Sequence, residues 1–253
     1  WGFDSLRGDK VPESNTTAKQ PTEMLVVLFD VKHFYLIALN QYKRTLKLEE
    51  NMDSNCVFCD RTQIEERIIT EGIDWYLIAS LGQITDGGYT LVIPKRHVSC
   101  VGAMNELEIN GIETLAIRAS DAIEMEYGIR PIIFEHGIVG QSIQHSHIHL
   151  LPTKIRLCGR IYRDFPNSQI CFLNSLKLLK WNYDFTGRRK YLLWSTPEGL
   201  LKVVIDPPAP PQYLRLIAAE LLGRPERGNW RNMDFELDKR LWQETVIRLK
   251  SYF

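Results

Sequence analysis

The sequence has no long uninterrupted apolar run and no excess of charge of either sign. Its most apolar stretch, residues 24–39, is interrupted by Asp30, Lys32 and His33, and is too short and too charged to span a bilayer. Lysine and arginine total 31, as do aspartate and glutamate, so the net charge indicates neither nucleic acid nor a membrane surface as a partner. No signal peptide is visible. We therefore expect a cytoplasmic protein that does not bind membranes.

Cysteine is scarce, and the five residues cannot form a complete set of pairs. Cys56 and Cys59 are two residues apart, whereas Cys100, Cys158 and Cys171 are scattered. This favours a reducing compartment with one metal site over a disulfide framework. A lone Cys-x-x-Cys pair can be redox-active, metal-binding or incidental. Since a polar loop precedes the pair here, and not the strand of a thioredoxin-like motif, we disfavour a redox role.

Histidine is also rare, yet three of the six histidines lie within five residues. On a strand, alternate side chains point to one face, so His145, His147 and His149 should share a face, with Ser146 and Ile148 on the other. Neutral imidazoles in such a row can bind a metal, or divide the roles of nucleophile and support. A cluster of titratable groups is a candidate active site.

Hydrophobic periodicity and turn residues predict a mixed α and β chain. A polar lead-in of about 21 residues precedes one or two helices that end near residue 50. Strands, helices and one hairpin follow. The expected strands are 75–79, 89–93, 131–134 and 145–151, the hairpin joins 191–194 to 201–205, and the helices are 105–127, 212–222 and 234–250.

Three blocks of the chain resemble the histidine triad (HIT) family, and they occur in that family's order. They are Cys56-Val-Phe-Cys59, the run Gly-Tyr-Thr-Leu-Val-Ile-Pro-Lys-Arg-His over 88–97, and Gly-Gln-Ser-Ile-Gln-His-Ser-His-Ile-His-Leu-Leu-Pro over 140–152. The resemblance implies an α+β fold, with an antiparallel sheet of about five strands and helices packed against one side. We expect a HIT-like domain over 51–153, between an N-terminal extension over 1–50 and a C-terminal extension over 154–253.

The resemblance also implies a mechanism. His147 would attack the phosphorus bonded to the nucleoside and form a covalent nucleotidyl-histidine. His149 would lie beside this α-phosphate, and Gln141 and Ser142 would hydrogen-bond its oxygens or the bridging atom. The glycine-containing loop 137–140 would let the backbone approach the phosphates closely.

Further substrate contacts are implied near that loop. Glu135 and His136 stand where small family members often have amide-bearing residues, and could tune leaving-group specificity or cap the loop. Together with Gly140, Gln141 and Ser142, they form the expected substrate-binding set. Two departures are Ser146, where an apolar residue is usual, and the strand end Ile78-Ala-Ser-Leu81, which lacks the Asn or His of small members.

A structural zinc site is implied by the same comparison. In zinc-bearing members, the partners of the two cysteines are the histidine after Pro-Lys-x and the first histidine of the triad. All four ligands are present here as Cys56, Cys59, His97 and His145. Zinc would then join the N-terminal edge of the fold to the triad strand.

The C-terminal hundred residues resemble, over 191–194, 211–225 and 229–231, the C-terminal part of CwfJ-like proteins, which are linked to RNA processing. Many of those proteins have glutamine in place of the third histidine, so the intact triad favours a working enzyme. The segment could supply substrate contacts, with Gln212 and Arg215 as candidates, or only complete the core or a dimer interface.

Two functions remain open. The leading hypothesis is a nucleotide hydrolase or nucleotidyl transferase that acts on dinucleoside polyphosphates or nucleoside phosphoramidates. The alternative is a CwfJ-like factor that binds RNA or DNA, supported by basic residues over 156–163 and 188–190; it predicts steeply salt-dependent binding and no need for His147. A zinc-centred structural protein would leave the triad and the Gln-Ser pair unexplained. Family domains often form homodimers, although the long C-terminal segment could block this.

Overall fold

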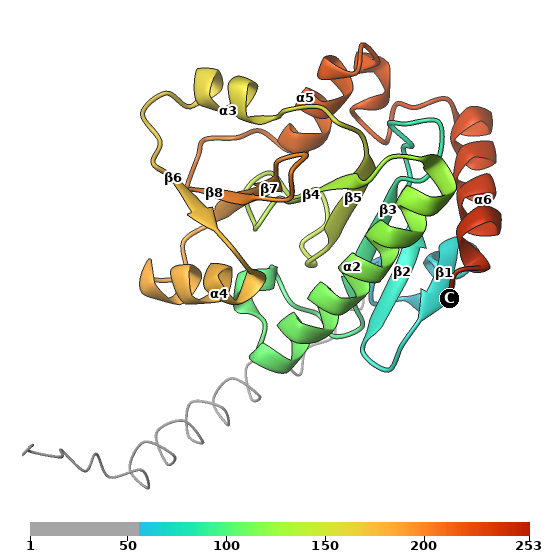
Figure 1. The fold of residues 1–253 in the computed structure, drawn as a ribbon, viewed down its shortest axis with the longest axis horizontal. Coiled ribbons are helices and arrows are strands. Elements are labelled where there is room, and N and C mark those ends of the chain that lie inside the picture. Colours follow the sequence, from blue (N-terminus) through green and yellow to red (C-terminus); the bar gives the residue numbers. More distant parts are fainter. Residues whose placement is uncertain (1–55) are drawn as a thin grey trace, which may run out of the picture. The chain divides into compact units, whose positions relative to one another are not determined.

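The computed structural model describes residues 56–253 (Figure 1). The extension expected over residues 1–50 lies outside the described residues. Within 56–253, no helix is both long and apolar enough to cross a membrane. Helices accompany an antiparallel sheet in this part of the chain, so the α+β class is confirmed.

Eight antiparallel strands form one sheet in the order β1-β2-β3-β5-β4-β7-β8-β6. The expectation of about five strands is right for the part up to residue 152 and too low for the described chain, because the C-terminal segment adds three strands. Phe134 and Glu135 of β4 pair with Trp194 and Leu193 of β7, so the sheet continues across the expected boundary at residue 153. The strands are β1 Ile68–Glu71, β2 Trp75–Ala79, β3 Thr90–Pro94, β4 Pro131–Glu135, β5 Ile148–Pro152, β6 Ile170–Leu173, β7 Tyr191–Ser195 and β8 Leu201–Ile205.

Side-chain caps mark the starts of α2, α4 and α6. The longest, α2, starts after Asn105, whose side chain forms a reciprocal capping box with Glu108, and ends at Gly128 with φ of 71°. The α-helices are α2 Glu106–Tyr127, α3 Cys158–Asp164, α4 Leu176–Phe185, α5 Tyr213–Leu221 and α6 Phe235–Lys250. The short 3-10 helices are η1 Arg61–Gln63, η2 Glu65–Arg67, η3 Val101–Ala103 and η4 Pro225–Arg227.

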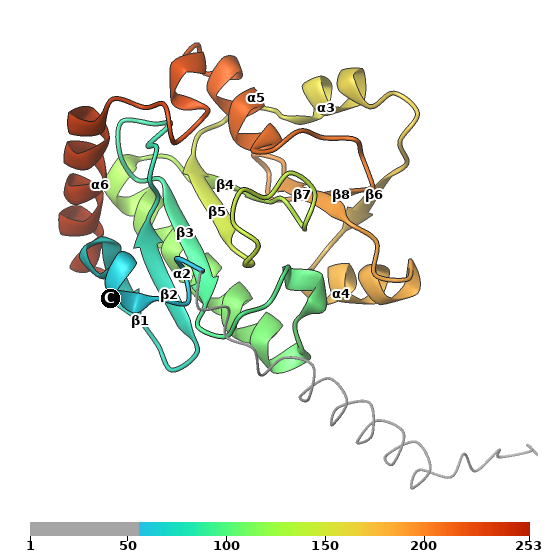
Figure 2. The same cartoon turned by 180° about the vertical axis from the view of Figure 1, so that it is seen from behind.

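Helices cover both faces of the described sheet, so the expectation of helices on one side holds for residues 56–153, whose one α-helix is α2, but not for the C-terminal segment, whose helices lie on both faces. Figure 1 shows α2 in front of the strands, and Figure 2, the view from behind, shows α5 in front of them. Residues of α2, α4 and α6 pack in one cluster with Leu77, Val92 and Leu150. Residues of α3 and α5 pack in a second cluster with Phe134 and Trp194. The C-terminal segment supplies part of this second cover, because an apolar sheet face must be buried against another element.

The cover on this second face has two parts. A third cluster packs the segment 56–64 against side chains of β2 and β3, including Ile78 and Leu91. The C-terminal helix α5 covers the neighbouring strands β4 and β7. Strand β5 lies between β3 and β4, so its side chains on this face lie where the two covers meet.

The triad strand is shorter than predicted. Strand β5 begins at Ile148, and Ser146 before it donates its N–H to the carbonyl of Val98 at 2.6 Å. The side chains nevertheless alternate, since Ser146 bonds Glu135 and Ile148 packs in the α2 cluster. The rings of His145 and His147 instead both contact Phe58, and His149 lies against His147 with ring centroids 4.8 Å apart. The predicted shared face of the three histidines therefore holds.

Candidate active site

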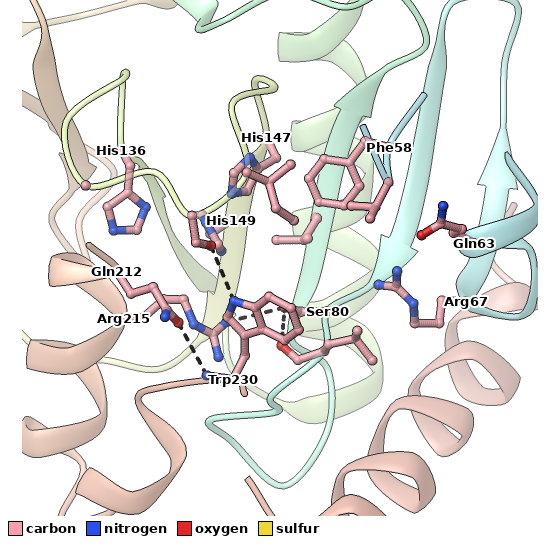
Figure 3. A pocket seen from close by; sticks show the side chains of 16 residues that line it. Phe58, Gln63, Arg67, Ser80, His136, His147, His149, Gln212, Arg215 and Trp230 are labelled. Carbon is pink, nitrogen blue, oxygen red and sulfur yellow. Dashed lines mark hydrogen bonds between the residues drawn. The ribbon is translucent and has the colours of Figure 1, made fainter. Parts of the chain in front are cut away.

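A cavity of about 270 Å³ lies over His147 and His149 (Figure 3). It is bounded by the segment 57–67, the end of β2, the loop 136–143 and the C-terminal segment. The lining residues are Val57, Phe58, Gln63, Arg67, Ser80, Leu81, Leu91, His136, Gly140, Ser142, Ile143, His147, His149, Gln212, Arg215 and Trp230. Residues of the expected HIT-like domain and of the C-terminal segment therefore line the cavity together. Gln212 and Arg215, the two candidates for substrate contacts from the C-terminal segment, are among them.

The ring of His147 lies in the cavity in one defined orientation. Its Nδ1 lies 2.6 Å from the carbonyl oxygen of His145. Because a carbonyl can only accept, Nδ1 carries the proton and Nε2 keeps its lone pair. Burial, with a smaller contribution from the positive charge of Arg215, lowers the pKa of His147 to about 4. The imidazole is therefore neutral near pH 7, with one unprotonated nitrogen available as a nucleophile.

The ring of His149 is held by one hydrogen bond and one stacking contact. Its Nδ1 lies 2.6 Å from the hydroxyl of Tyr89, and its ring stacks on Phe134 with centroids 4.4 Å apart. The Tyr89 oxygen already accepts from Nη1 of Arg215 at 2.9 Å, so the tyrosine proton is free to go to Nδ1. This leaves the histidine proton on Nε2, a buried atom that has no partner within residues 56–253. Burial holds the pKa of His149 well below its usual value.

His145 belongs to a separate cluster with Cys56, Cys59 and His97. The four ligand atoms lie within 4.8 Å of one another. Nδ1 of His145 lies 3.4 Å from Sγ of Cys56 and 3.5 Å from Sγ of Cys59, and Nδ1 of His97 lies 3.3 Å from Sγ of Cys59. These side chains form a cluster that could hold a metal ion.

The cluster fits zinc in both spacing and donor set. Tetrahedral zinc with Zn–S of about 2.3 Å and Zn–N of about 2.0–2.1 Å sets each S···N distance near 3.5 Å. The other nitrogen of His145 lies 2.9 Å from the carbonyl of Pro94 and donates to it, which leaves Nδ1 unprotonated for a metal. All four positions of a tetrahedral ion would be filled by protein, as in structural sites.

The glycine loop approaches the C-terminal segment closely. Gly140 has φ of +70°, and a Cβ atom there would lie 2.6 Å from the carbonyl oxygen of Pro210. The carbonyl of Gly140 accepts from the backbone N–H of Gln212 at 2.7 Å. The adjacent Ser142 lines the cavity, and its hydroxyl accepts from the indole N–H of Trp230 at 3.3 Å. Gly140 and Ser142 therefore lie where the sequence predicts.

Gln141 does not line the cavity, and its predicted role in phosphate contact is not supported by its position. Its side-chain N–H donates to the carbonyl of Ser99 at 2.7 Å. Its Oε1 is buried and has no partner among residues 56–253. The alternation of the chain turns this side chain away from the cavity, whereas its neighbours Gly140 and Ser142 line it.

Glu135 also lies outside the cavity, on the opposite side of its strand. Its carboxylate accepts from Val101 N–H at 2.8 Å, the Ser146 hydroxyl at 2.9 Å and the Tyr191 hydroxyl at 2.6 Å. Complete burial raises the pKa of Glu135 to about 7. The expected substrate contact is therefore wrong in geometry. The side chain instead ties Tyr191 of the C-terminal segment to Ser146, between two histidines of the triad.

His136 lines the cavity, in agreement with the sequence, and also caps a helix. Its Nε2 accepts from the backbone N–H of Leu214, in the first turn of α5, at 3.1 Å. Burial lowers the pKa of His136 to about 3, so the ring is a neutral acceptor near pH 7. The loop next to the triad is thereby attached to the C-terminal helix.

The C-terminal segment contributes an arginine to the centre of the site. Arg215 is 3% exposed and donates to the carbonyls of Gly228 at 3.2 Å and Gly82 at 2.8 Å, as well as to Tyr89. Gln212 lines the cavity, but its side chain bonds Asn229 and the N–H of Trp230. The side chain of Gln212 therefore mainly contacts the loop that carries Trp230.

Sequence reasoning missed Arg67, Tyr89 and Trp230 as site residues, and noted Ser80 only as a departure from the family pattern. Tyr89 precedes β3, which pairs with the triad strand through Leu91 opposite His149. A sequence pattern that predicts strands does not say which strands are neighbours, so nothing local linked these residues to the triad.

Known proteins match the part of the chain that carries the triad. The HIT domain family matches residues 61–155. An uncharacterized HIT-like protein of Mycoplasma genitalium is 30% identical over 109 residues, which cover 42% of this chain and 77% of that protein. An uncharacterized 16.1 kDa HIT-like protein of Mycoplasma pneumoniae is 24% identical over 104 residues, 40% of this chain and 72% of that protein. The chain belongs to the HIT family.

Solved structures with a similar region include a HIT family protein from Bacillus anthracis. It is 28% identical with a TM-score of 0.37, and the match covers 39% of this chain and 73% of that one. A HIT family hydrolase from Clostridium thermocellum is 28% identical with a TM-score of 0.32, covering 40% and 91%. The family match ends at residue 155, so the CwfJ-like resemblance of the C-terminal segment stays a prediction.

Proposed function

We propose that this protein is a nucleotide hydrolase or nucleotidyl transferase that works through a covalent nucleotidyl-His147 intermediate. The observation that carries the proposal is the hydrogen bond from Nδ1 of His147 to the carbonyl of His145, which leaves the lone pair of Nε2 available in the cavity. Substrates would be dinucleoside polyphosphates or nucleoside phosphoramidates, attacked at the α-phosphate.

In the first step, Nε2 of His147 forms a bond to the α-phosphorus while the bond to the leaving group breaks. The electron pair of that bond goes to the leaving group, which departs as a phosphate or as an amine that takes up a proton from water. The positive charge that develops on the ring is stabilised by the carbonyl of His145 at Nδ1. Water or another acceptor then attacks the phosphorus, breaks the P–N bond and restores neutral His147; the acceptor's proton goes to solvent.

Neighbouring groups support the developing negative charge on the phosphoryl oxygens. Nε2–H of His149 is a buried donor without a partner in the described part of the chain, and the Ser142 hydroxyl lies on the cavity wall. No Asp or Glu is among the residues that line the cavity, so nothing there repels a phosphate. Pre-oriented donors of this kind stabilise a transition state more than a mobile solvent does.

We further propose that Cys56, Cys59, His97 and His145 hold a structural zinc ion. When bound, zinc would supply no open position for chemistry and would fix His145 in place. Because the carbonyl of His145 orients His147, a fixed His145 also fixes the nucleophile.

The RNA- or DNA-binding alternative loses much of its support in the structure. Of the basic residues over 156–163 and 188–190, Arg156 pairs with Glu198, Arg160 with Asp164 and Glu220, and Arg189 with Asp206. Paired arginines offer less charge to a phosphate backbone. Homodimer formation and a cytoplasmic location stay predictions.

A trapping experiment tests the proposal. The protein is mixed with a diadenosine polyphosphate or an adenosine phosphoramidate, quenched, and analysed as intact protein and peptides by mass spectrometry. We expect a nucleotide adduct on the peptide that contains His147, absent in His147→Ala and present in Cys171→Ser, a matched control on the distant strand β6. Lack of an adduct and of product across adenine and guanine substrates would reject the proposal and favour nucleic-acid binding.

A further inference from the structure

Two arginines from distant parts of the chain line the same cavity. Arg67 ends η2 near the start of the described chain, and Arg215 lies in the first turn of α5. They are 8% and 3% exposed. In Figure 3 their side chains lie on either side of the Trp230 indole.

Both guanidinium groups bind the end of strand β2. Nη1 of Arg67 donates to the carbonyl of Ala79 at 3.1 Å. Nη1 of Arg215 donates to the Ser80 hydroxyl at 3.4 Å, and its Nη2 donates to the carbonyl of Gly82 at 2.8 Å. Two positive charges are therefore brought to successive residues where the strand passes into its loop.

Neither arginine has a carboxylate partner within residues 56–253, and all the oxygens that they bind are neutral. The carboxylate of Asp238 favours the charged form of Arg67 at a distance, but its two oxygens accept from the backbone N–H groups of Gly82 and Gln83. Burial of a cation without a paired anion is costly, and an anionic ligand removes this cost. Burial lowers the pKa of Arg67 to about 10, so the side chain is still charged near pH 7.

The charge of the cavity exceeds what one attacked phosphate would balance. Among the described residues, no Asp or Glu lines the cavity, so no carboxylate there offsets the charge of either arginine. The two arginines then give the cavity two positive charges. An α-phosphate esterified on one side and linked to a leaving group on the other carries about one negative charge. One positive charge is left for another group of the ligand.

We infer that Arg67 and Arg215 bind a second phosphate group of the substrate, separate from the phosphate that His147 attacks. Guanidinium groups recognise phosphate oxygens through their five N–H donors, of which Arg67 uses one in its bond to Ala79, whereas Arg215 keeps one beside its four bonds to protein oxygens. The inference rests on the proposed function for its first phosphate. The second phosphate has two sources with the same chemistry: the next phosphate of a linear chain, or a phosphate ester on the sugar.

Binding of unreactive nucleotides tests the inference. Calorimetry compares a nucleoside 5′-monophosphate, the 5′-diphosphate and the 3′,5′-bisphosphate, in the adenosine and guanosine series. We expect one of the two-phosphate ligands to bind at least about 10-fold more tightly than the monophosphate. The ligand that gains affinity identifies the source: the diphosphate indicates a linear chain, and the bisphosphate a phosphate on the sugar.

Variants connect this gain to the two side chains. Arg67→Gln should abolish the gain and change monophosphate affinity by less than about 3-fold. Arg67→Lys should retain part of the gain, whereas Arg130→Gln, which changes a surface arginine paired with Asp121 and Glu124, should retain all of it. Because Arg215→Gln could disturb the fold, Arg215→Lys is compared with it, and thermal melting reports on folding.

The inference is overturned if the monophosphate binds as tightly as both two-phosphate ligands, if no two-phosphate ligand binds below about 1 mM, or if Arg67→Gln weakens all ligands equally. The trapping experiment is independent of these outcomes. An adduct on His147 without a two-phosphate preference would reject the inference alone. A two-phosphate preference without an adduct would reject the proposed reaction and leave the second phosphate site.

Discussion

The hydroxyl of Tyr89 lies 2.6 Å from Nδ1 of His149. The same oxygen accepts from Arg215, which has only donors, so Nδ1 of His149 is the natural acceptor for the tyrosine proton. The contact assigns the proton of His149 to Nε2, where it can be donated to a phosphoryl oxygen. A residue before β3 and an arginine from α5 thus set the chemical state of the triad's third histidine.

Tyr89→Phe should slow formation of the nucleotidyl-His147 adduct about 10- to 100-fold and change monophosphate affinity little, because the ring of His149 loses the partner that orients it. Quenched single-turnover reactions measure the rate, and calorimetry measures affinity. Tyr162→Phe, on an exposed side chain whose hydroxyl contacts Lys202, is the control. Equal rates in the two variants would show that Tyr89 does not act on His149.

Purified protein should contain one equivalent of zinc by elemental analysis. Cys59→Ser should lose the metal and lower the melting temperature by about 10 °C, since ligand binding free energy contributes to folding. Adduct formation should also slow, because His145 no longer fixes the carbonyl that orients His147. Cys171→Ser is the matched control and should keep the metal. Stoichiometric zinc in Cys59→Ser would contradict the proposed ligand set.

The sequence predicted those parts of the site whose residues lie close together in the chain or follow a fixed spacing. The spacing His-x-His-x-His determined a shared face, and the order of the three family blocks implied the Cys and His cluster. Strands bounded by Gly and Pro were also predictable, such as β2, which was expected over 75–79. Each of these features depends on residues close together in the chain or on a pattern with a fixed period.

The contacts that complete the site depend on sheet order and were not predictable in the same way. Glu135 is a charged residue that a sequence pattern places in a loop or at a substrate, yet it is buried beside Tyr191, which is 56 residues away. Arg67 follows two glutamates in a stretch that resembles a solvated helix face, and it contacts the cavity only because η2 lies against β2. Burial of such groups requires partners that only the folded sheet supplies.

Stability should fall on acidification between about pH 7 and 5. The fold lowers the pKa of three histidines from 6.5. The pKa of His136 falls to about 3, that of His147 to about 4, and that of His149 well below 6.5. The unfolded chain therefore binds more protons in this range, and the stability present above pH 6.5 is lost as the pH falls. Glu135 acts in the opposite direction, because its pKa is raised to about 7, and its contribution at low pH is lost as the pH rises above 4.5.

Three histidines outweigh one carboxyl group, so the net loss should be about 3 kcal/mol between pH 7 and 5. Urea unfolding at a series of pH values measures it. Glu135→Gln removes the opposing titration and should make the loss steeper by about 2 kcal/mol. Comparison of the two slopes cancels any effect of pH on the metal site. A slope in the variant no steeper than in the wild type would show that Glu135 is ionised in the folded protein throughout this range.

Gly140→Ala should both destabilise the fold and weaken the active site. Gly140 and Gly187 have nearly the same φ, +70° and +75°, but differ in their surroundings. A Cβ at Gly140 would lie 2.6 Å from the Pro210 carbonyl, whereas a Cβ at Gly187 would meet nothing within 4 Å. Gly187→Ala therefore measures the strain of a left-handed residue alone, about 1 kcal/mol.

Gly140→Ala should cost about 2–3 kcal/mol, because the segment that leads into α5 must also move away from the loop. That movement shifts Gln212, whose N–H binds the Gly140 carbonyl, and with it the loop that carries Trp230. Adduct formation on His147 should therefore slow in Gly140→Ala and stay unchanged in Gly187→Ala, measured beside urea unfolding. If both variants lost the same stability and kept the same rate, close approach of the C-terminal segment to the glycine loop would not be needed for the site.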